Sequence, residues 1–225
     1  MIEAHYIFAA VAVIGTSIGA YVDYKKTWIP DSVNYFMIAF GLIGNIVVSI
    51  ITSSFTPILY SLFGFLSFLA IGLTLYYLGG TGGGDAKMFM GFGALLATFP
   101  AVSLWPFLMT ILANTILISG LFGAIVLLAR LTTKKPLFTK EISPSNLMEG
   151  DWIKDNISVG ELHYTPKRTG IDKETIEKLK QLERDGKLKS ITIKTGIPMA
   201  PAIFVALLIS LFAGDLMFMV VSSLL

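Results

Sequence analysis

Two long stretches of the chain contain no charged residue, and these stretches most constrain how it can fold. Residues 32–84 and residues 88–129 lack Asp, Glu, Lys and Arg altogether, and apolar residues dominate both. A helix needs about 20 apolar residues to cross the hydrocarbon core of a membrane. Each stretch is therefore long enough for two membrane spans. Only 14% of the whole chain is charged, which is low for a soluble domain.

Turn-forming residues divide these stretches into separate spans. Residues 52–57 interrupt the first stretch, and the segment from Pro100 to Pro106 interrupts the second. Apolar segments near the two ends of the chain add two more spans. The first of these lacks a basic start and a small-residue cleavage site, so we interpret it as a retained span and not as a signal peptide. The sequence thus predicts six transmembrane helices, near residues 4–22, 32–51, 57–78, 86–99, 105–129 and 197–222.

The basic residues are distributed asymmetrically among the loops. With six spans, the loops at 23–31, 79–87 and 130–195 share one side of the membrane and hold all 17 Lys and Arg residues. Because basic loops remain in the cytoplasm, we expect these three loops to be cytoplasmic and both termini to lie outside the cell membrane. Trp28 and Trp105 lie near span ends and are interpreted as interfacial anchors.

The loop at 131–195 has the composition of a small soluble domain. Asp172 is expected to cap a helix that stops at Gly186. A strand is expected over residues 188–193, with residues 161–165 as its partner strand. The predicted fold is an all-α polytopic membrane protein with six transmembrane helices and a small α+β cytoplasmic insertion. Its domains are predicted as the membrane domain 1–130 with spans one to five, the soluble insertion 131–195, and the sixth span 196–225.

Two aspartates at the predicted cytoplasmic face require a functional explanation. Asp23 ends the first span and Asp85 lies between the third and fourth, so six spans place both on one face. Ionisable groups at membrane depth are costly and usually functional. Two facing carboxylates cannot both ionise easily, so one can activate water as a base while the other polarises a peptide carbonyl. This chemistry needs no metal and no cofactor.

The surroundings of Asp85 are rich in glycine. Five of the six residues at 79–84 are glycines, which lets the backbone adopt unusual conformations and lets a peptide approach closely. The alternative is a flexible turn in which Asp85 is a helix N-cap, and glycine content alone favours neither interpretation. Lys87 either tunes Asp85 through its charge or anchors the span end on the cytoplasmic side.

Two other acids near span ends are better explained as caps. Asp31 precedes the second span, where it or Ser32 is expected to cap the helix. Asp215 lies in the last span near the outer face, where we expect a cap or interface residue. An ion-coupled transporter or channel is an alternative, since glycine-broken helices and membrane acids also mark ion sites. A non-enzymatic scaffold is a third, and it predicts that amide substitutions of the two central aspartates are silent.

Several ordered motifs resemble one family. Residues Gly82-Gly83-Gly84-Asp85 match the GxGD motif of membrane aspartyl peptidases. Asp23 followed by Ile29-Pro30-Asp31, and the proline-containing segment 196–201, are similar to segments of the type IV prepilin peptidase family. Within that family, the chain most resembles the archaeal preflagellin peptidases.

The resemblance has consequences for the site and its substrates. It implies that Asp23 and Asp85 are catalytic, that Gly82 and Gly84 are motif glycines, and that Lys87 lies near the substrate. It also implies cleavage of short basic class III signal peptides from preflagellin or pilin-like precursors. Besides these precursors, the lipid bilayer is the expected partner, and nucleic acid is not.

Overall fold

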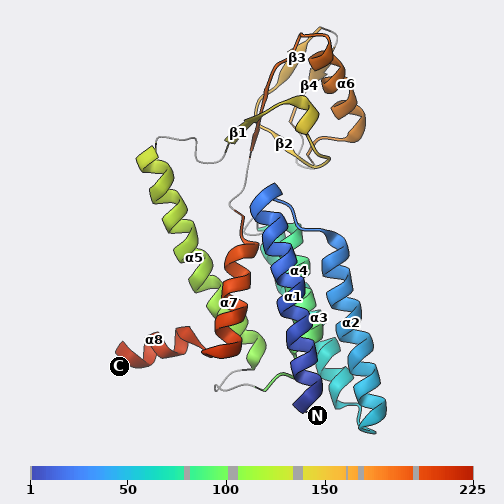
Figure 1. The fold of residues 1–225 in the computed structure, drawn as a ribbon, viewed down its shortest axis with the longest axis vertical. Coiled ribbons are helices and arrows are strands. Elements are labelled where there is room, and N and C mark those ends of the chain that lie inside the picture. Colours follow the sequence, from blue (N-terminus) through green and yellow to red (C-terminus); the bar gives the residue numbers. More distant parts are fainter. Residues whose placement is uncertain are drawn as a thin grey trace. The chain divides into compact units, whose positions relative to one another are not determined.

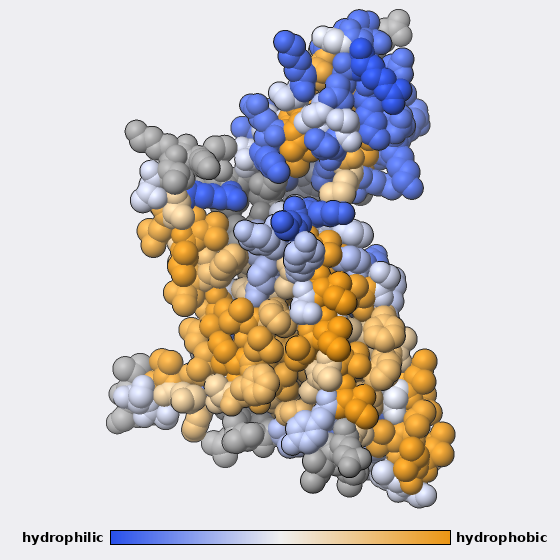
Figure 2. Space-filling model, in the orientation of Figure 1, coloured by the Kyte–Doolittle hydropathy of each residue, from blue (hydrophilic) through white to orange (hydrophobic). Residues whose placement is uncertain are grey.

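Long apolar helices make up most of the chain, as a computed structural model shows for residues 2–78, 82–100, 106–133, 139–160, 162–166, 170–194 and 198–224 (Figure 1). The chain forms two units. One contains Met1–Ala124 and Pro198–Leu225, and the other contains Ile125–Ile197. The predicted insertion at 131–195 lies inside the second unit. Figure 2 shows hydrophobic residues over the helical unit and hydrophilic residues over much of the second.

Four helices of the described chain are long and apolar enough to cross a membrane. They are α1 (Ile2–Lys26), α2 (Asp31–Ile51), α3 (Thr56–Tyr77) and α5 (Phe107–Thr133). The sequence placed helices at all four positions, and these helix predictions are confirmed. The turn between α2 and α3 falls at the predicted break, where Ser53 has a positive φ of 49° and Pro57 opens α3. Trp28 is exposed, and Trp105 lies outside the described residues.

The helix α4 (Gly83–Leu96) is short and almost entirely enclosed by its neighbours. It has 14 residues, which rise about 21 Å against a hydrocarbon core of about 30 Å. The structure has a helix at the predicted fourth span, near 86–99, and this helix begins three residues earlier, at Gly83. Small residues allow α2 and α3 to approach α4 closely: Gly41 lies against Ala94, and Gly64 lies against Gly93.

The predicted sixth span is not one continuous helix, and this part of the prediction was wrong. The chain instead forms α7 (Ala200–Phe212) and α8 (Leu216–Leu224), with Gly214 at a φ of +86° between them. Asn114 of α5 stabilises the break, because its side chain donates to the Gly214 carbonyl at 2.8 Å and accepts from the Leu216 N–H at 2.9 Å. Backbone groups released from a helix in an apolar environment need such partners.

Asp215 caps the second of these helices. Its Oδ1 accepts from the Phe218 N–H at 2.9 Å, so it satisfies one of the free donors in the first turn of α8. The expectation that Asp215 is a cap is confirmed. The total of six membrane spans remains a prediction, because α4, α7 and α8 are each shorter than a full crossing.

The second unit combines two small sheets with the helix α6 (Lys173–Arg184). One sheet has the strand order β1-β5-β2, and the other pairs β3 with β4. The bounds of these strands are Thr139–Ile142 for β1, Trp152–Ile153 for β2, Ile157–Val159 for β3, Leu162–Tyr164 for β4 and Ile191–Lys194 for β5, and the short 3-10 helix η1 covers Pro144–Asn146. Nine buried residues form the core of this unit.

The helix prediction for this unit is confirmed, whereas the strand pairing is wrong. Asp172 Oδ1 accepts from the Thr175 N–H at 2.8 Å at the start of α6, and Gly186 has a φ of +71° just after its end. However, β4 pairs with β3 and not with β5. Val159 pairs with Leu162, so only two residues separate these strands, and so short a loop favours a local hairpin. Glu161, from the predicted partner strand, lies outside the described residues.

Candidate active site

Asp23 lies in the last part of α1, where it contacts the start of α7. Its side chain is 6% exposed, and its Oδ2 accepts from the Ala200 N–H at 3.0 Å. Ala200 is the first residue of α7. The first N–H groups of a helix have no partner within the helix and carry partial positive charge, so they favour a carboxylate. The proline-containing segment noted in the sequence thus brings a donor to Asp23; its residues Gly196 and Ile197 lie outside the described chain.

Asp85 is the third residue of α4 and is 8% exposed. Gly82 is the N-cap of this helix, so the interpretation of Asp85 as the N-cap residue is wrong. The carboxylate instead reaches back, and its Oδ2 accepts from the Gly82 N–H at 3.3 Å. The other oxygen, Oδ1, is buried and has no hydrogen-bond partner among the described residues. One oxygen of Asp85 is therefore held by the helix start, and the second is uncommitted.

The packing of α1 against α4 places Asp23 and Asp85 near each other. When both carboxylates are ionised, they lie close enough for their like charges to repel. The helices approach closely where Gly19 faces Met88: a Cβ atom on Gly19 would lie 2.6 Å from Met88 Cε. Asp23 and Asp85 thus lie near each other in the helical unit, although they are 62 positions apart in the sequence.

The two motif glycines have different surroundings. A Cβ atom on Gly84 would lie 2.9 Å from Cβ of Ile29, which is itself buried, so this position has no room for a side chain. Among the described residues, a Cβ atom on Gly82 would meet only Asp85 Oδ2, at 3.2 Å. Close packing therefore explains glycine at position 84 more strongly than at position 82. Residues 79–81 of the glycine-rich segment lie outside the described residues.

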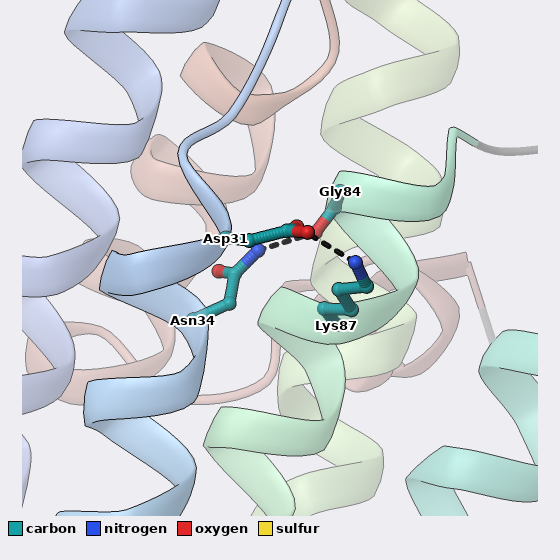
Figure 3. A network of polar contacts seen from close by, with 4 residues as sticks. All are labelled: Asp31, Asn34, Gly84 and Lys87. Carbon is teal, nitrogen blue, oxygen red and sulfur yellow. Dashed lines mark hydrogen bonds and ion pairs between the residues drawn. The ribbon is translucent and has the colours of Figure 1, made fainter.

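Lys87 pairs with Asp31, as Figure 3 shows. Its Nζ lies 2.7 Å from Asp31 Oδ1 and 5.3 Å from the centre of the Tyr35 ring, which is within cation–π range. Asp31 is the first residue of α2, the N-cap is Pro30, and no side chain of a described residue caps this helix. The expectation of a cap by Asp31 or Ser32 is therefore wrong, because the Asp31 carboxylate is directed to Lys87.

Sequence reasoning missed Asn34, which is fully buried in α2. Its Nδ2 donates to the carbonyl oxygen of Gly84 at 3.0 Å, immediately before Asp85 (Figure 3). A signal was available, because Asn34 and Asn45 are amide side chains within the charge-free stretch 32–84. Buried polar groups in such surroundings need partners and are seldom incidental.

The Asp31–Lys87 pair is expected to add little to stability. Its side chains are 52% and 30% exposed, so solvent screens the attraction. In a double-mutant cycle with Asp31→Asn and Lys87→Gln, we expect a coupling energy of about 1 kcal/mol or less. Thermal unfolding of the four proteins in detergent measures it. A coupling above about 2 kcal/mol would show instead that the pair is desolvated within the folded protein.

Comparisons with known proteins identify the family of this chain. The model of the "Type IV leader peptidase family" matches residues 10–128, which include Asp23 and Asp85. Curated relatives named "Preflagellin peptidase" are 37% identical over 89 residues in Methanocaldococcus jannaschii, 33% over 90 residues in Methanococcus voltae, and 34% over 89 residues in Methanococcus maripaludis.

The relatives match this chain over less than half of its length, so their activity is not carried over to it directly. Each aligned region covers 40% of this chain and 38% of the relative. The family model, by contrast, covers more than half of the chain and includes the segment that carries both aspartates. Four helices have the length and composition of membrane spans. The chain is therefore a multi-pass membrane protein that belongs to the type IV leader peptidase family.

Proposed function

We propose that this protein is an aspartyl endopeptidase that removes the leader peptide from preflagellin-type or prepilin-type precursors. The observation that carries the proposal is that two buried carboxylates, Asp23 near the end of α1 and Asp85 at the start of α4, lie close enough for their charges to interact. The family match includes both residues, and the similar proteins are named preflagellin peptidases.

The proposed reaction uses the two carboxylates as one acid–base unit. The ionised carboxylate takes a proton from water, and the water oxygen attacks the carbonyl carbon of the scissile peptide bond. The protonated partner gives its proton to the carbonyl oxygen. When the tetrahedral intermediate collapses, the amide nitrogen accepts the proton that the first carboxylate took from water, and the C–N bond breaks. One hydroxyl of the intermediate returns its proton to the second carboxylate, and a carboxylic acid and a new amino terminus are released. Because the pair titrates as a unit, neither residue is assigned a fixed role.

The proposed site faces the cytoplasm in a protein with six spans. All 17 basic residues then lie on the cytoplasmic side, together with Asp23 and Asp85, and both termini lie outside. This arrangement suits a substrate whose short basic leader remains in the cytoplasm while the following apolar segment enters the membrane. Cleavage just before that apolar segment would occur where the two aspartates lie.

Cysteine labelling tests the orientation, since the native chain contains no cysteine. In intact cells or sealed right-side-out vesicles, Ser53→Cys should react with a membrane-impermeant maleimide, whereas Lys154→Cys should react only after the membrane is opened. Both positions are exposed, so access depends on the side of the membrane. The opposite labelling pattern would invert the proposed topology.

Cleavage of a precursor tests the activity itself. Detergent-purified protein would be mixed with a purified preflagellin and with a pilin-like precursor, and product masses would be followed over time. We expect loss of a short amino-terminal peptide from at least one precursor. If neither is cleaved by protein that remains folded, the proposed peptidase activity on these substrates is wrong. Ion flux in liposomes would then test the transporter alternative.

A further inference from the structure

One buried side chain holds the peptide unit that immediately precedes Asp85. Asn34 is 0% exposed, and its Nδ2 donates to the Gly84 carbonyl oxygen at 3.0 Å. That carbonyl belongs to the same planar amide as the Asp85 N–H, so its orientation fixes where the Asp85 backbone begins. The bond crosses from α2 to the first turn of α4 (Figure 3).

Two further contacts join the same parts of α2 and α4. Ile29, just before α2, packs against Gly84 so tightly that no Cβ atom would fit there. Asp31 binds Lys87, one turn into α4. The six residues 29–34 therefore contact residues 84–87, at the start of α4, through an apolar contact, a hydrogen bond and an ion pair.

This six-residue segment is also connected to the other aspartate. It follows the end of α1 directly, and the Thr27 N–H donates to the Asp23 carbonyl oxygen at 2.7 Å. Thr27 has a positive φ of 54°, so the chain reverses sharply between Asp23 and Ile29. Residues 29–34 therefore contact one catalytic segment while they continue directly from the other.

We infer that Asn34 is a positioning residue that sets the spacing of the Asp23 and Asp85 carboxylates, an inference that rests on the proposed peptidase function. Asn34 does not act on substrate. It restrains the Gly84 peptide so that the uncommitted Oδ1 of Asp85 stays in place relative to Asp23. A small displacement of one member would weaken the coupling between the two carboxylates and slow the chemical step.

Asn45 provides a matched control on the same two helices. It is 1% exposed, and its Nδ2 donates to the Ala94 carbonyl oxygen of α4 at 3.2 Å and to the Gly41 carbonyl oxygen at 2.9 Å. Like Asn34, it has a buried Oδ1 without a partner among the described residues. It differs in contacting the end of α4 remote from Asp85. If the two asparagines served only to pack α2 against α4, substitutions at both positions should have similar effects on cleavage.

The kinetic test compares Asn34→Leu, Asn34→Ser and Asn45→Leu with wild type on a cleaved precursor. For both Asn34 variants we expect kcat to fall about 10- to 100-fold, with KM within about threefold of wild type, because misplaced catalytic groups slow chemistry and not binding. The pH dependence of kcat should also shift, since it reports the coupled pair. Asn45→Leu should keep the wild-type pH profile. Equal effects at both asparagines, or an unchanged profile in folded Asn34 variants, would overturn the inference.

A second measurement does not depend on catalysis. The chain has no cysteine, so Asp23→Cys and Asp85→Cys can be combined and cross-linked with bifunctional thiol reagents of graded length. Because a displaced Gly84 peptide should move position 85 relative to position 23, we expect Asn34→Ser to slow the reaction with the shortest effective reagent about fivefold or more. Asn45→Leu should leave the rate of this reaction unchanged. The same rate in all backgrounds would refute the positioning role. A wild-type protein that cleaves no precursor would refute the proposed function, while this comparison would still decide the inference.

Discussion

Asp23→Asn and Asp85→Asn are each expected to lower the rate of precursor cleavage at least about 1,000-fold. An amide of nearly the same shape cannot exchange a proton as a carboxyl group does, and acid–base catalysis contributes about 10²- to 10⁴-fold. The two losses should not add in the double variant, because the carboxylates act as one unit. Product mass, followed over a long incubation with purified protein and precursor, measures the residual rate.

Asp215→Asn is the matched control for these variants. Asp215 is a third buried acid, 8% exposed like Asp85, and its Oδ1 caps α8 by accepting from the Phe218 N–H. An asparagine retains this acceptor, so cleavage should remain within about threefold of wild type, because asparagine is as good an N-cap as aspartate. If Asp23→Asn and Asp85→Asn cleave as fast as Asp215→Asn, the proposed catalytic pair is wrong and the scaffold interpretation gains support.

Gly93→Ala is expected to destabilise the packing of α3 against α4 strongly. A Cβ atom on Gly93 would lie 2.6 Å from the carbonyl carbon of Gly64 and 2.9 Å from the Phe65 nitrogen. These are backbone atoms of α3, so no side-chain rotation can relieve the overlap, and α3 must move away from α4. Overpacking costs about 1–3 kcal/mol, and we expect the upper end of that range here. Thermal unfolding in detergent, with size-exclusion chromatography, would show the loss.

Gly120→Ala and Gly123→Ala serve as controls for the same substitution. Both glycines lie in α5, and a Cβ atom at either position would have no neighbour within 4 Å in the part of the chain that the structure describes. Alanine should therefore be tolerated there, and it removes the entropic cost of glycine in a helix. If Gly93→Ala unfolds at the same temperature as these variants, the close approach of α3 and α4 described here is incorrect.

The parts of the fold that were predicted correctly have local signals. The bounds of α2 and α3 follow from the charge-free segment 32–84 and from the turn at 52–57, whereas α1, predicted over 4–22, continues as a helix to Lys26. The α6 helix follows from its capping residue, Asp172, and from the glycine after its end. In each case, the residues that decide the structure are neighbours in the sequence, so composition and spacing are enough to find them.

Two of the predictions that failed depended on distant partners. The break at Gly214 is stabilised by Asn114, which bonds the released backbone groups and is 100 positions away. Asp31 and Lys87 each had a plausible local role, as a cap and as an anchor or charge partner. Their actual pairing arises because α2 and α4 are in contact.

By itself, the sequence determined the apolar helices, the glycine-rich motif and the identity of the two aspartates, because these features are properties of short segments. Only the tertiary structure decided that Asp23 binds the start of α7, that Asn34 holds the Gly84 carbonyl, and that Lys87 faces Asp31. These contacts join residues separated by 177, 50 and 56 positions. No local pattern specifies which distant groups meet, because that depends on how close-packed helices, with small residues at their interfaces, align along their whole length.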